Sequence, residues 1–377
     1  MKKSFLLFAT VLMCVGCNKK VDKEAYVVDC DQVQDVLFED VTTNVRVVPL
    51  MSSEPLGASY SVMGSDDEVF IRDNTHEYVY YLKDNKLQGT LHSVGRGPGE
   101  YITLKHISYN KNNKVLYLQH YEDSKTILQY SVPDMKYIGK LTVPASSVAR
   151  VYPYDDNTLI MAMESEPNKP GVFLYDIKSQ QITRKVCDIG TFSFSYSERI
   201  LETFSKDHPY MSQFGTTHQI CRIGADSIDV MFKFNFGKYT PDAMVYGHIE
   251  DLADAERVLG YFFDSQNSEM VKNYIYPYYT DNENLSFWYT NLMGDKFWYF
   301  KMENGKAEMY KGFRIPGLNL EVKPSFSTGH GYAMIIEGVK ESLIDPDTPL
   351  SPLAQKIIDV MSSQNDNNPV LLYFDIK

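Results

Sequence analysis

One short segment has residue types that could form a ligand-binding loop, and it reads Gly95, Arg96, Gly97, Pro98, Gly99, Glu100 and Tyr101. Glycines permit positive φ angles and close backbone approach, whereas a proline fixes one φ angle and removes an N–H donor. One interpretation is that the loop amides, with Arg96 and Glu100, line a binding site. The other is a sharp connection between two structural units, which we prefer because glycine is ordinary at turns. The segment matches neither the P-loop nor the dinucleotide-binding fingerprint.

The eight histidines form no recognisable motif, and they stand at positions 76, 92, 106, 120, 208, 218, 248 and 330. The chain has no H-E-x-x-H sequence and no close Cys/His set with the spacing of zinc ligands. We therefore interpret each histidine as an ordinary loop or strand residue. Residues far apart in sequence can still meet in a folded chain, so a composite His/Asp metal site stays open.

Carboxylates and aromatic side chains give equally general signals. The pairs Asp66-Asp67 and Asp155-Asp156 could coordinate calcium, but aspartate is simply favoured in turns. Residues 287–289 and 297–299 are aromatic triplets that could stack on sugars, although alternation at strand spacing favours a role in the core. No G-x-S-x-G elbow occurs. The sequence identifies no catalytic residue and no cofactor, and it leaves open calcium or another divalent metal.

The N-terminus is predicted to be a lipoprotein signal peptide, residues 1–16, with Cys17 as the lipid-carrying first residue of the mature chain. Lysines near the start precede an apolar run that is shorter than the roughly 20 residues of a membrane-spanning helix. Gly16 before Cys17 resembles the lipobox, although Cys14 stands where that motif prefers leucine. A redox or metal reading of Cys14 and Cys17 is rejected, because both lie within or beside a membrane-inserting segment.

The mature chain is acidic: without Lys2 and Lys3, 35 basic residues face 49 acidic ones, a formal charge of −14. This charge opposes nucleic acid and anionic lipid as partners, so we expect membrane contact only through the anchor. We also expect a monomer. Asn18, not aspartate, follows the anchor, which favours the outer membrane. Surface export of lipoproteins usually goes with an acidic cluster directly after the lipidated cysteine, whereas Lys19 and Lys20 stand there in this chain, which favours the periplasmic face over surface exposure.

Three cysteines remain in the mature chain: Cys30, Cys187 and Cys221. An odd and sparse set is not a disulfide framework. One bridge between Cys187 and Cys221, or three buried thiols, are both compatible with the sequence.

A repeating strand pattern predicts an all-β fold. The chain holds 28 Tyr and 20 Phe, many in short alternating segments separated by turn residues. Repeated units begin near positions 69, 115, 158, 218, 286 and 331. Three of the steps match the 40–50 residues of a four-stranded propeller blade, and two longer steps imply insertions in the fourth and fifth units. The pattern predicts a six-bladed β-propeller over residues 44–377.

Closure of the ring and two helical insertions complete the predicted architecture. The strand Asn44–Leu50 lacks a nearby partner, so we expect it to complete the blade formed by the C-terminal units. Apolar residues spaced by three and four predict helices over Pro241–Phe263 and Leu350–Ser363. Residues 17–43 are weakly patterned and are predicted to be the lipidated N-terminus and a tether of about 25 residues.

The segment Val94–Tyr101, with the lipobox, the six units and the Asn-Pro-Val sequence at Asn368, resembles the TolB-like six-bladed β-propeller lipoproteins of Bacteroides-type bacteria. The resemblance extends over essentially the whole mature chain, and Val94–Tyr101 is its most diagnostic part. It implies a secreted propeller but does not imply a particular ligand.

Two functions agree with these observations. The first, which we prefer, is a non-catalytic binding or scaffold module that presents the propeller to a protein, peptide or glycan partner. The second is a hydrolase or lyase with a metal or carboxylate site at the propeller channel, an analogy at the level of the fold. Whether the protein catalyses any reaction stays open at this point.

Overall fold

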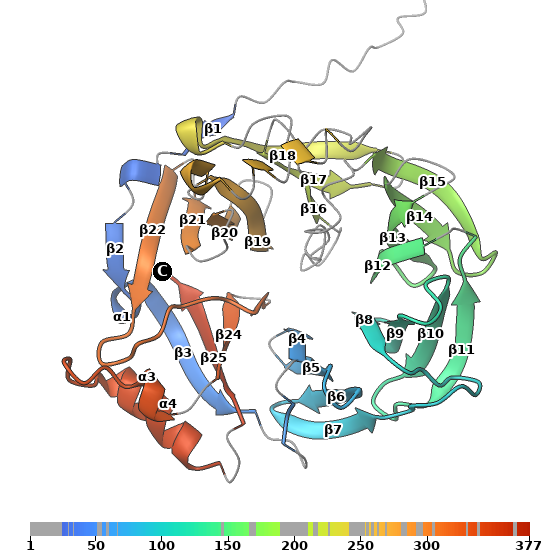
Figure 1. Cartoon of the computed structure of the whole chain (residues 1–377), viewed down its shortest axis with the longest axis horizontal. Helices are drawn as coiled ribbons and strands as arrows, with labels where there is room; N and C mark the ends of the chain where they lie inside the picture. Colours follow the sequence, from blue (N-terminus) through green and yellow to red (C-terminus); the bar gives the residue numbers. More distant parts are fainter. Residues whose placement is uncertain are drawn as a thin grey trace, which may run out of the picture.

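The computed structural model shows a ring of six β-sheets, each of which is one blade (Figure 1). It describes residues 25–28, 30–32, 34–50, 55–57, 60–65, 67–144, 147–165, 171–188, 210–213, 218–224, 227–240, 253, 256–257, 260–261, 264–267, 270–279, 285–291, 297–303, 306–328, 331–337, 340–364 and 368–377. The predicted six-bladed β-propeller is confirmed. No helix in these ranges is long and apolar enough to cross a membrane.

Blades 1 to 3 are built from consecutive strands. They are β4 (Tyr60–Gly64), β5 (Glu68–Asp73), β6 (Tyr78–Lys83) and β7 (Lys86–Leu91) in blade 1; β8 (Leu104–Asn110), β9 (Val115–His120), β10 (Thr126–Ser131) and β11 (Tyr137–Thr142) in blade 2; and β12 (Ser147–Pro153), β13 (Thr158–Ser165), β14 (Gly171–Asp176) and β15 (Gln181–Asp188) in blade 3.

Blades 4 to 6 each take their last strand from the N-terminal part of the chain. They are β16 (Tyr210–Gln213), β17 (His218–Ile223) and β18 (Ile228–Asn235) with β1 (Tyr26–Val27) in blade 4; β19 (Val271–Tyr279), β20 (Leu285–Asn291), β21 (Phe297–Glu303) and β22 (Lys306–Arg314) with β2 (Gln34–Leu37) in blade 5; and β23 (Phe326–Ser327), β24 (Tyr332–Ile336) and β25 (Val370–Ile376) with β3 (Thr42–Pro49) in blade 6.

The repeated units of the sequence start on the second strand of each blade, not on the first. The strands that precede them, β4, β8, β12, β16 and β19, lie closest to the centre of the ring (Figure 1). The inner strand β4 lacks a continuous buried run: only Gly64 is buried, whereas four consecutive residues of β5 are. The extra length of the two long steps falls between β15 and β16 and between β18 and β19.

The ring closes as expected, because β3 pairs with β25 in an antiparallel register that runs from Val370–Pro49 to Ile376–Thr42. Blade 6 therefore combines both ends of the chain. Ring closure removes the open sheet edges that the first and last blades would otherwise expose.

The segment predicted to be a tether differs from that expectation in its C-terminal part. Here β1 pairs in parallel with β18 and β2 in parallel with β22, so the chain runs along blades 4, 5 and 6 in turn. Both residues of β1 are exposed, and backbone hydrogen bonds at a sheet edge need no apolar pattern. That is why the sequence gives so weak a signal for these strands.

The predicted helix near the C-terminus is confirmed as α4 (Pro352–Ser362). Its N-cap Ser351 accepts a hydrogen bond from the Ala354 N–H at 3.2 Å, and Ala354, Ile357 and Ile358 pack against blade 6. Most of the predicted helix Pro241–Phe263 lies outside the described residues. The described ones assigned as helical are Ala253, Glu256, Arg257, Gly260 and Tyr261. The remaining helical elements are short: η1 (Cys30–Gln32), α1 (Phe38–Val41), η4 (Gly237–Tyr239), η6 (Ser265–Asn267) and α3 (Lys340–Leu343).

Aromatic side chains fill the spaces between blades, as their alternation indicates. Trp288, Tyr299 and Tyr332 are almost completely buried in one cluster between blades 5 and 6. Trp298 and Phe300 are buried on the opposite face of blade 5, against residues of blade 4. The described residues of the two aromatic triplets therefore belong mostly to the core.

Candidate functional site

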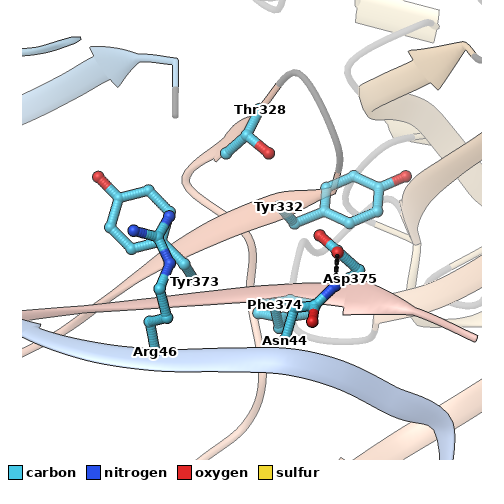
Figure 2. A pocket seen from close by; sticks show the side chains of 7 residues that line it. All are labelled: Asn44, Arg46, Thr328, Tyr332, Tyr373, Phe374 and Asp375. Carbon is cyan, nitrogen blue, oxygen red and sulfur yellow. Dashed lines mark hydrogen bonds between the residues drawn. The ribbon is translucent and has the colours of Figure 1, made fainter. Parts of the chain in front are cut away.

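A pocket of about 400 Å³ opens on blade 6, in the size range of small-ligand sites (Figure 2). Strand β3 contributes two of its residues, β25 contributes three, β24 contributes one, and the last follows β23. In chain order, the lining residues are Asn44, Arg46, Thr328, Tyr332, Tyr373, Phe374 and Asp375. The pocket therefore forms between β3, from the N-terminal part of the chain, and the C-terminal strands.

An irregularity in the β3–β25 pairing shapes this pocket. The register shifts between Tyr373 and Asp375, so that Tyr373 pairs with Arg46 but Asp375 pairs with Thr43. Asn44, inside the shifted stretch, has a φ of 52°, a conformation that asparagine tolerates better than most residues. Such bulges re-aim side chains and are frequent beside functional sites.

Three aromatic residues from both faces of the blade-6 sheet line the pocket, and an arginine lies over one of them. Tyr332, Tyr373 and Phe374 are all at least 97 % buried. The Arg46 Cζ lies 4.6 Å from the centre of the Tyr373 ring, a cation–π contact. Arg46 is exposed, lines the pocket and, within the described part of the chain, forms no hydrogen bond or ion pair. Figure 2 shows the guanidinium beside the ring.

The opposite side of the pocket carries oxygen acceptors. Asn44 Nδ2 donates a hydrogen bond to Asp375 Oδ2 at 2.7 Å. Among the described residues, Asp375 Oδ1 and Asn44 Oδ1 accept no hydrogen bond. Gly331 lies close by, and a Cβ there would come within 2.5 Å of Asp375 Oδ1, so a larger residue would crowd the carboxylate. The pocket thus holds a cation and an anion that do not pair with each other.

The segment Gly95–Tyr101 connects blade 1 to blade 2, as the preferred interpretation expects. Glu100 Oε2 accepts a hydrogen bond from the Gly97 N–H at 2.6 Å, and the Gly95 N–H donates to the Tyr101 carbonyl at 2.9 Å. The hydroxyl of Tyr130 donates to the Gly99 carbonyl. Several backbone polar groups of the loop are therefore hydrogen-bonded, either within the loop or to Tyr130.

Tyr101 anchors this loop in the core of blades 1 and 2. It is 1 % exposed, and its hydroxyl donates to the Glu77 carbonyl at 2.9 Å. Arg96 is exposed. Several large hydrophobic side chains in and around the loop are also exposed: Val94, Ile102, Tyr121, Tyr137 and Ile138. A binding role for the loop stays a prediction.

Two described histidines, His76 and His120, have polar partners nearby in the sequence. His76 Nδ1 lies 2.9 Å from Asp73, whose carboxylate also accepts from the backbone N–H groups of Gly57, Thr75 and His76 itself. Burial raises the pKa of Asp73, but these hydrogen bonds outweigh it and lower the pKa. His120 Nδ1 lies 3.1 Å from Glu122. His208, His248 and His330 lie outside the described residues.

His106 is the histidine in the most unusual environment. Its Nδ1 lies 2.9 Å from Arg150 Nη1, which donates to it. Burial, followed by the charges of Arg150, Arg72 and Lys105, holds the pKa of His106 well below 6.5. In the described part of the chain, no group of three His, Cys, Asp or Glu residues is arranged to hold a metal ion.

The remaining sequence candidates lie in turns or in the core. Asp155 accepts from the Asn157 N–H at 2.7 Å, and Asp67 lies 3.5 Å from Lys111. Asp66 lies outside the described residues. Cys30 and Cys221 are buried, and the side chain of Cys187 lies outside the described part, so the bridge stays a prediction.

Sequence reasoning found neither Arg46 nor Asp375. It identified the closing strand and the final strand, but not the side chains that their pairing brings together. The sequence held one signal for this site: an arginine and an aspartate, Arg46 and Asp375, in two strands that were expected to pair.

A family model described as "6-bladed beta-propeller" matches residues 16–310 of the chain. The chain belongs to this six-bladed β-propeller family. Among solved structures, it is similar to a protein from Bacteroides fragilis named as a candidate exported protein. That match has a TM-score of 0.69 and 14 % identity, and covers 94 % of this chain and 99 % of the other.

A second similar structure is a member of the duf4221 family from Bacteroides vulgatus. Its TM-score is 0.50 at 8 % identity, covering 89 % of this chain and 98 % of the other. At such identities the two structures support the fold alone. No curated protein matches the chain significantly.

Proposed function

We propose that this propeller is an exported, lipid-anchored binding module of the cell envelope that holds a protein, peptide or glycan partner without transforming it. The observation that carries the proposal is the blade-6 pocket, where Arg46 lies over the buried Tyr373 ring and, among the described residues, donates no hydrogen bond. Convergent polar groups over an apolar floor are typical of ligand sites. Residues 1–16 and Cys17 support export and anchoring, as does the exported-protein name of the similar Bacteroides fragilis structure.

The pocket has the components that a polar organic ligand needs. Tyr332, Tyr373 and Phe374 form apolar walls but are almost completely buried, so the polar groups would make most of the contact with a ligand. The Arg46 guanidinium offers donors in a fixed fork, which its position over Tyr373 helps to orient. Asn44 and Asp375 offer acceptors on the other side. Because β3 and β25 are hydrogen-bonded neighbours in blade 6, the backbone that carries these groups is ordered before the ligand arrives.

The proposed anchor would hold the propeller close to the membrane. Only residues 18–25 separate Cys17 from β1 on blade 4. A fully extended chain of that length reaches roughly 30 Å. The proposed location is the periplasmic face of the outer membrane, with blade 4 as the part of the ring nearest to the lipid.

Lipidation is tested by metabolic labelling with palmitate. Wild-type protein and the matched variant Lys20→Ala are expected to carry label and to sediment with membranes. Cys17→Ser is expected to lose the label and to be released from the membrane fraction. Full labelling of Cys17→Ser would contradict the anchor.

Binding is tested with the full mature protein in detergent on immobilised peptide and glycan arrays. We expect at least one ligand class to bind, and Arg46→Ala to weaken that binding at least tenfold. Arg96→Ala removes an exposed arginine from the Gly95–Tyr101 loop and is expected to bind like the wild type. A ligand lost with Arg96→Ala but retained by Arg46→Ala would overturn the assignment of the site.

A further inference from the structure

We infer that the blade-6 pocket binds the zwitterionic head of a free α-amino acid, with its carboxylate on Arg46 and its ammonium on Asp375 and Asn44. This inference rests on the proposed binding function and names the ligand of the same pocket. It follows from two opposite charges that share one pocket and stay apart.

Arg46 is suited to hold the carboxylate. A guanidinium binds a carboxylate through two parallel N–H···O hydrogen bonds, a strong and directional pairing. The Arg46 guanidinium lies over the Tyr373 ring, with 4.6 Å between Cζ and the ring centre. A cation–π contact is not a hydrogen bond, so it does not use up the N–H donors that a ligand would need.

Asp375 and Asn44 are suited to hold the ammonium. The Asn44 amide donates to Asp375 Oδ2 at 2.7 Å, which holds the carboxylate beside Asn44 and leaves the other oxygen of each side chain as an acceptor. Asp375 Oδ1 and Asn44 Oδ1 are then two acceptors beside one negative charge, which suits an –NH₃⁺ group with its three donors.

The two charged residues come from neighbouring positions in the strand pairing. Arg46 pairs with Tyr373, and Asp375 lies two residues further along β25, a backbone spacing of roughly 7 Å at the rise of a strand. An α-amino acid carries both of its charged groups on one carbon, so it can contact both sides at once. The volume of about 400 Å³ leaves room for its side chain.

An uncharged sugar would use this arrangement less well. It would place a hydroxyl against each charge and neutralise neither, whereas each charged group of an amino acid meets an opposite charge. Asn44 engages Asp375, and among the described residues Arg46 and Asp375 form no ion pair with each other. A zwitterion supplies both missing counter-charges.

The test is isothermal titration of the full mature protein in detergent with each common amino acid, followed by two blocked forms of the best ligand. We expect the N-acetyl form, which lacks the ammonium, and the amide form, which lacks the carboxylate, each to bind at least tenfold more weakly. A tenfold loss corresponds to about 1.4 kcal/mol. These ligand comparisons use wild-type protein, so they do not depend on the folding of a variant.

Two substitutions assign the charges. With Arg46→Gln, the amide form should bind as well as the free amino acid, because the carboxylate has lost its partner. With Asp375→Asn, the N-acetyl form should bind as well as the free amino acid. Arg96→Gln is the matched control and should preserve the wild-type preference for the free amino acid over both blocked forms.

The outcomes separate this inference from the proposed function. If no free amino acid binds while a glycan or a blocked peptide binds and depends on Arg46, the inference is wrong and the binding function stands. If blocked and free forms bind equally, the inference is also wrong. If amino acids, peptides and glycans all fail to bind, both are wrong.

Discussion

The Gly95–Tyr101 loop and the blade-6 pocket differ in what their polar groups do. In the loop, Glu100 accepts from the Gly97 N–H and Tyr130 donates to the Gly99 carbonyl, so the polar groups are used to fix the loop itself. In the pocket, Arg46 lies over an aromatic ring and donates no hydrogen bond to any residue that the structure describes. The loop is conspicuous in the sequence, whereas the pocket is visible only in the folded chain.

This difference shows what a glycine-rich motif reports. Such a motif indicates where the backbone takes unusual angles or approaches another group closely, and a tight connection between blades requires both. It does not by itself indicate a ligand. If the loop is a structural element and the pocket a binding element, substitutions in the loop should lower stability, and substitutions in the pocket should lower ligand binding. The opposite pattern would reverse that assignment.

The largest expected effect is the loss of the loop anchor in Tyr101→Ala. The side chain is 1 % exposed and its hydroxyl donates to the Glu77 carbonyl, so its removal leaves a cavity and an unpaired carbonyl. We expect the free energy of unfolding to fall by about 3–5 kcal/mol. Urea denaturation measures this, with Arg96→Ala as the control expected to stay within about 0.5 kcal/mol of wild type. Equal stability of the two variants would contradict a structural role for the loop.

A smaller loss is expected for Gly99→Ala. Gly99 has a φ of +76°, and a Cβ there would come within 2.4 Å of the Tyr137 ring. We expect a cost of about 1–3 kcal/mol from backbone strain and the displaced ring. Gly97→Ala is the matched control, because its Cβ would meet only the flexible end of Glu100 at 3.0 Å. A larger loss for Gly97→Ala would show that the backbone angle of Gly99 is not the constraint.

The pH dependence of unfolding tests a third region, the inner strand β8, which carries His106. Because the pKa of His106 is held well below 6.5 in the folded state, the unfolded chain takes up the proton first. The stabilising contribution of neutral His106 is thus complete above pH 6.5 and is lost as the pH falls below it, by up to about 1.4 kcal/mol per pH unit. Denaturation about one pH unit above and below 6.5 measures this loss, and His106→Gln should reduce it. An unchanged slope in the variant would assign the loss to other groups.

The smallest expected effect on stability is that of Arg46→Ala. The side chain is exposed and loses only a cation–π contact, which at exposed sites contributes about 0.5–1 kcal/mol. Urea denaturation should therefore show a nearly unchanged free energy of unfolding, while ligand binding falls. A loss of several kcal/mol would indicate that Arg46 stabilises ring closure and does not primarily serve a ligand.

Much of the fold could be predicted from the sequence because the middle strands of each blade are buried on both faces. Strands such as β5 and β9 are apolar runs of regular spacing. The inner strands and the parallel strands β1 and β2 could not be predicted in the same way. They are short or half-exposed and are held by backbone pairing, which leaves little trace in side-chain pattern.

The candidate site was less predictable than the fold. Arg46 and Asp375 are separated by most of the chain, and only the register between β3 and β25 brings them together. The shift of that register at Tyr373 depends on local backbone geometry around Asn44. Sequence patterns predicted that these two strands pair, but they do not report a bulge or which side chains it exposes.

Hydrogen exchange measured by mass spectrometry, with and without ligand, tests the central claim most directly. If the blade-6 pocket is the binding site, ligand should slow exchange in peptides that contain Asn44–Arg46 and Tyr373–Asp375. Peptides that contain Gly95–Tyr101 should exchange at the same rate in both conditions. Protection confined to Gly95–Tyr101, with no change in β3 and β25, would contradict the account.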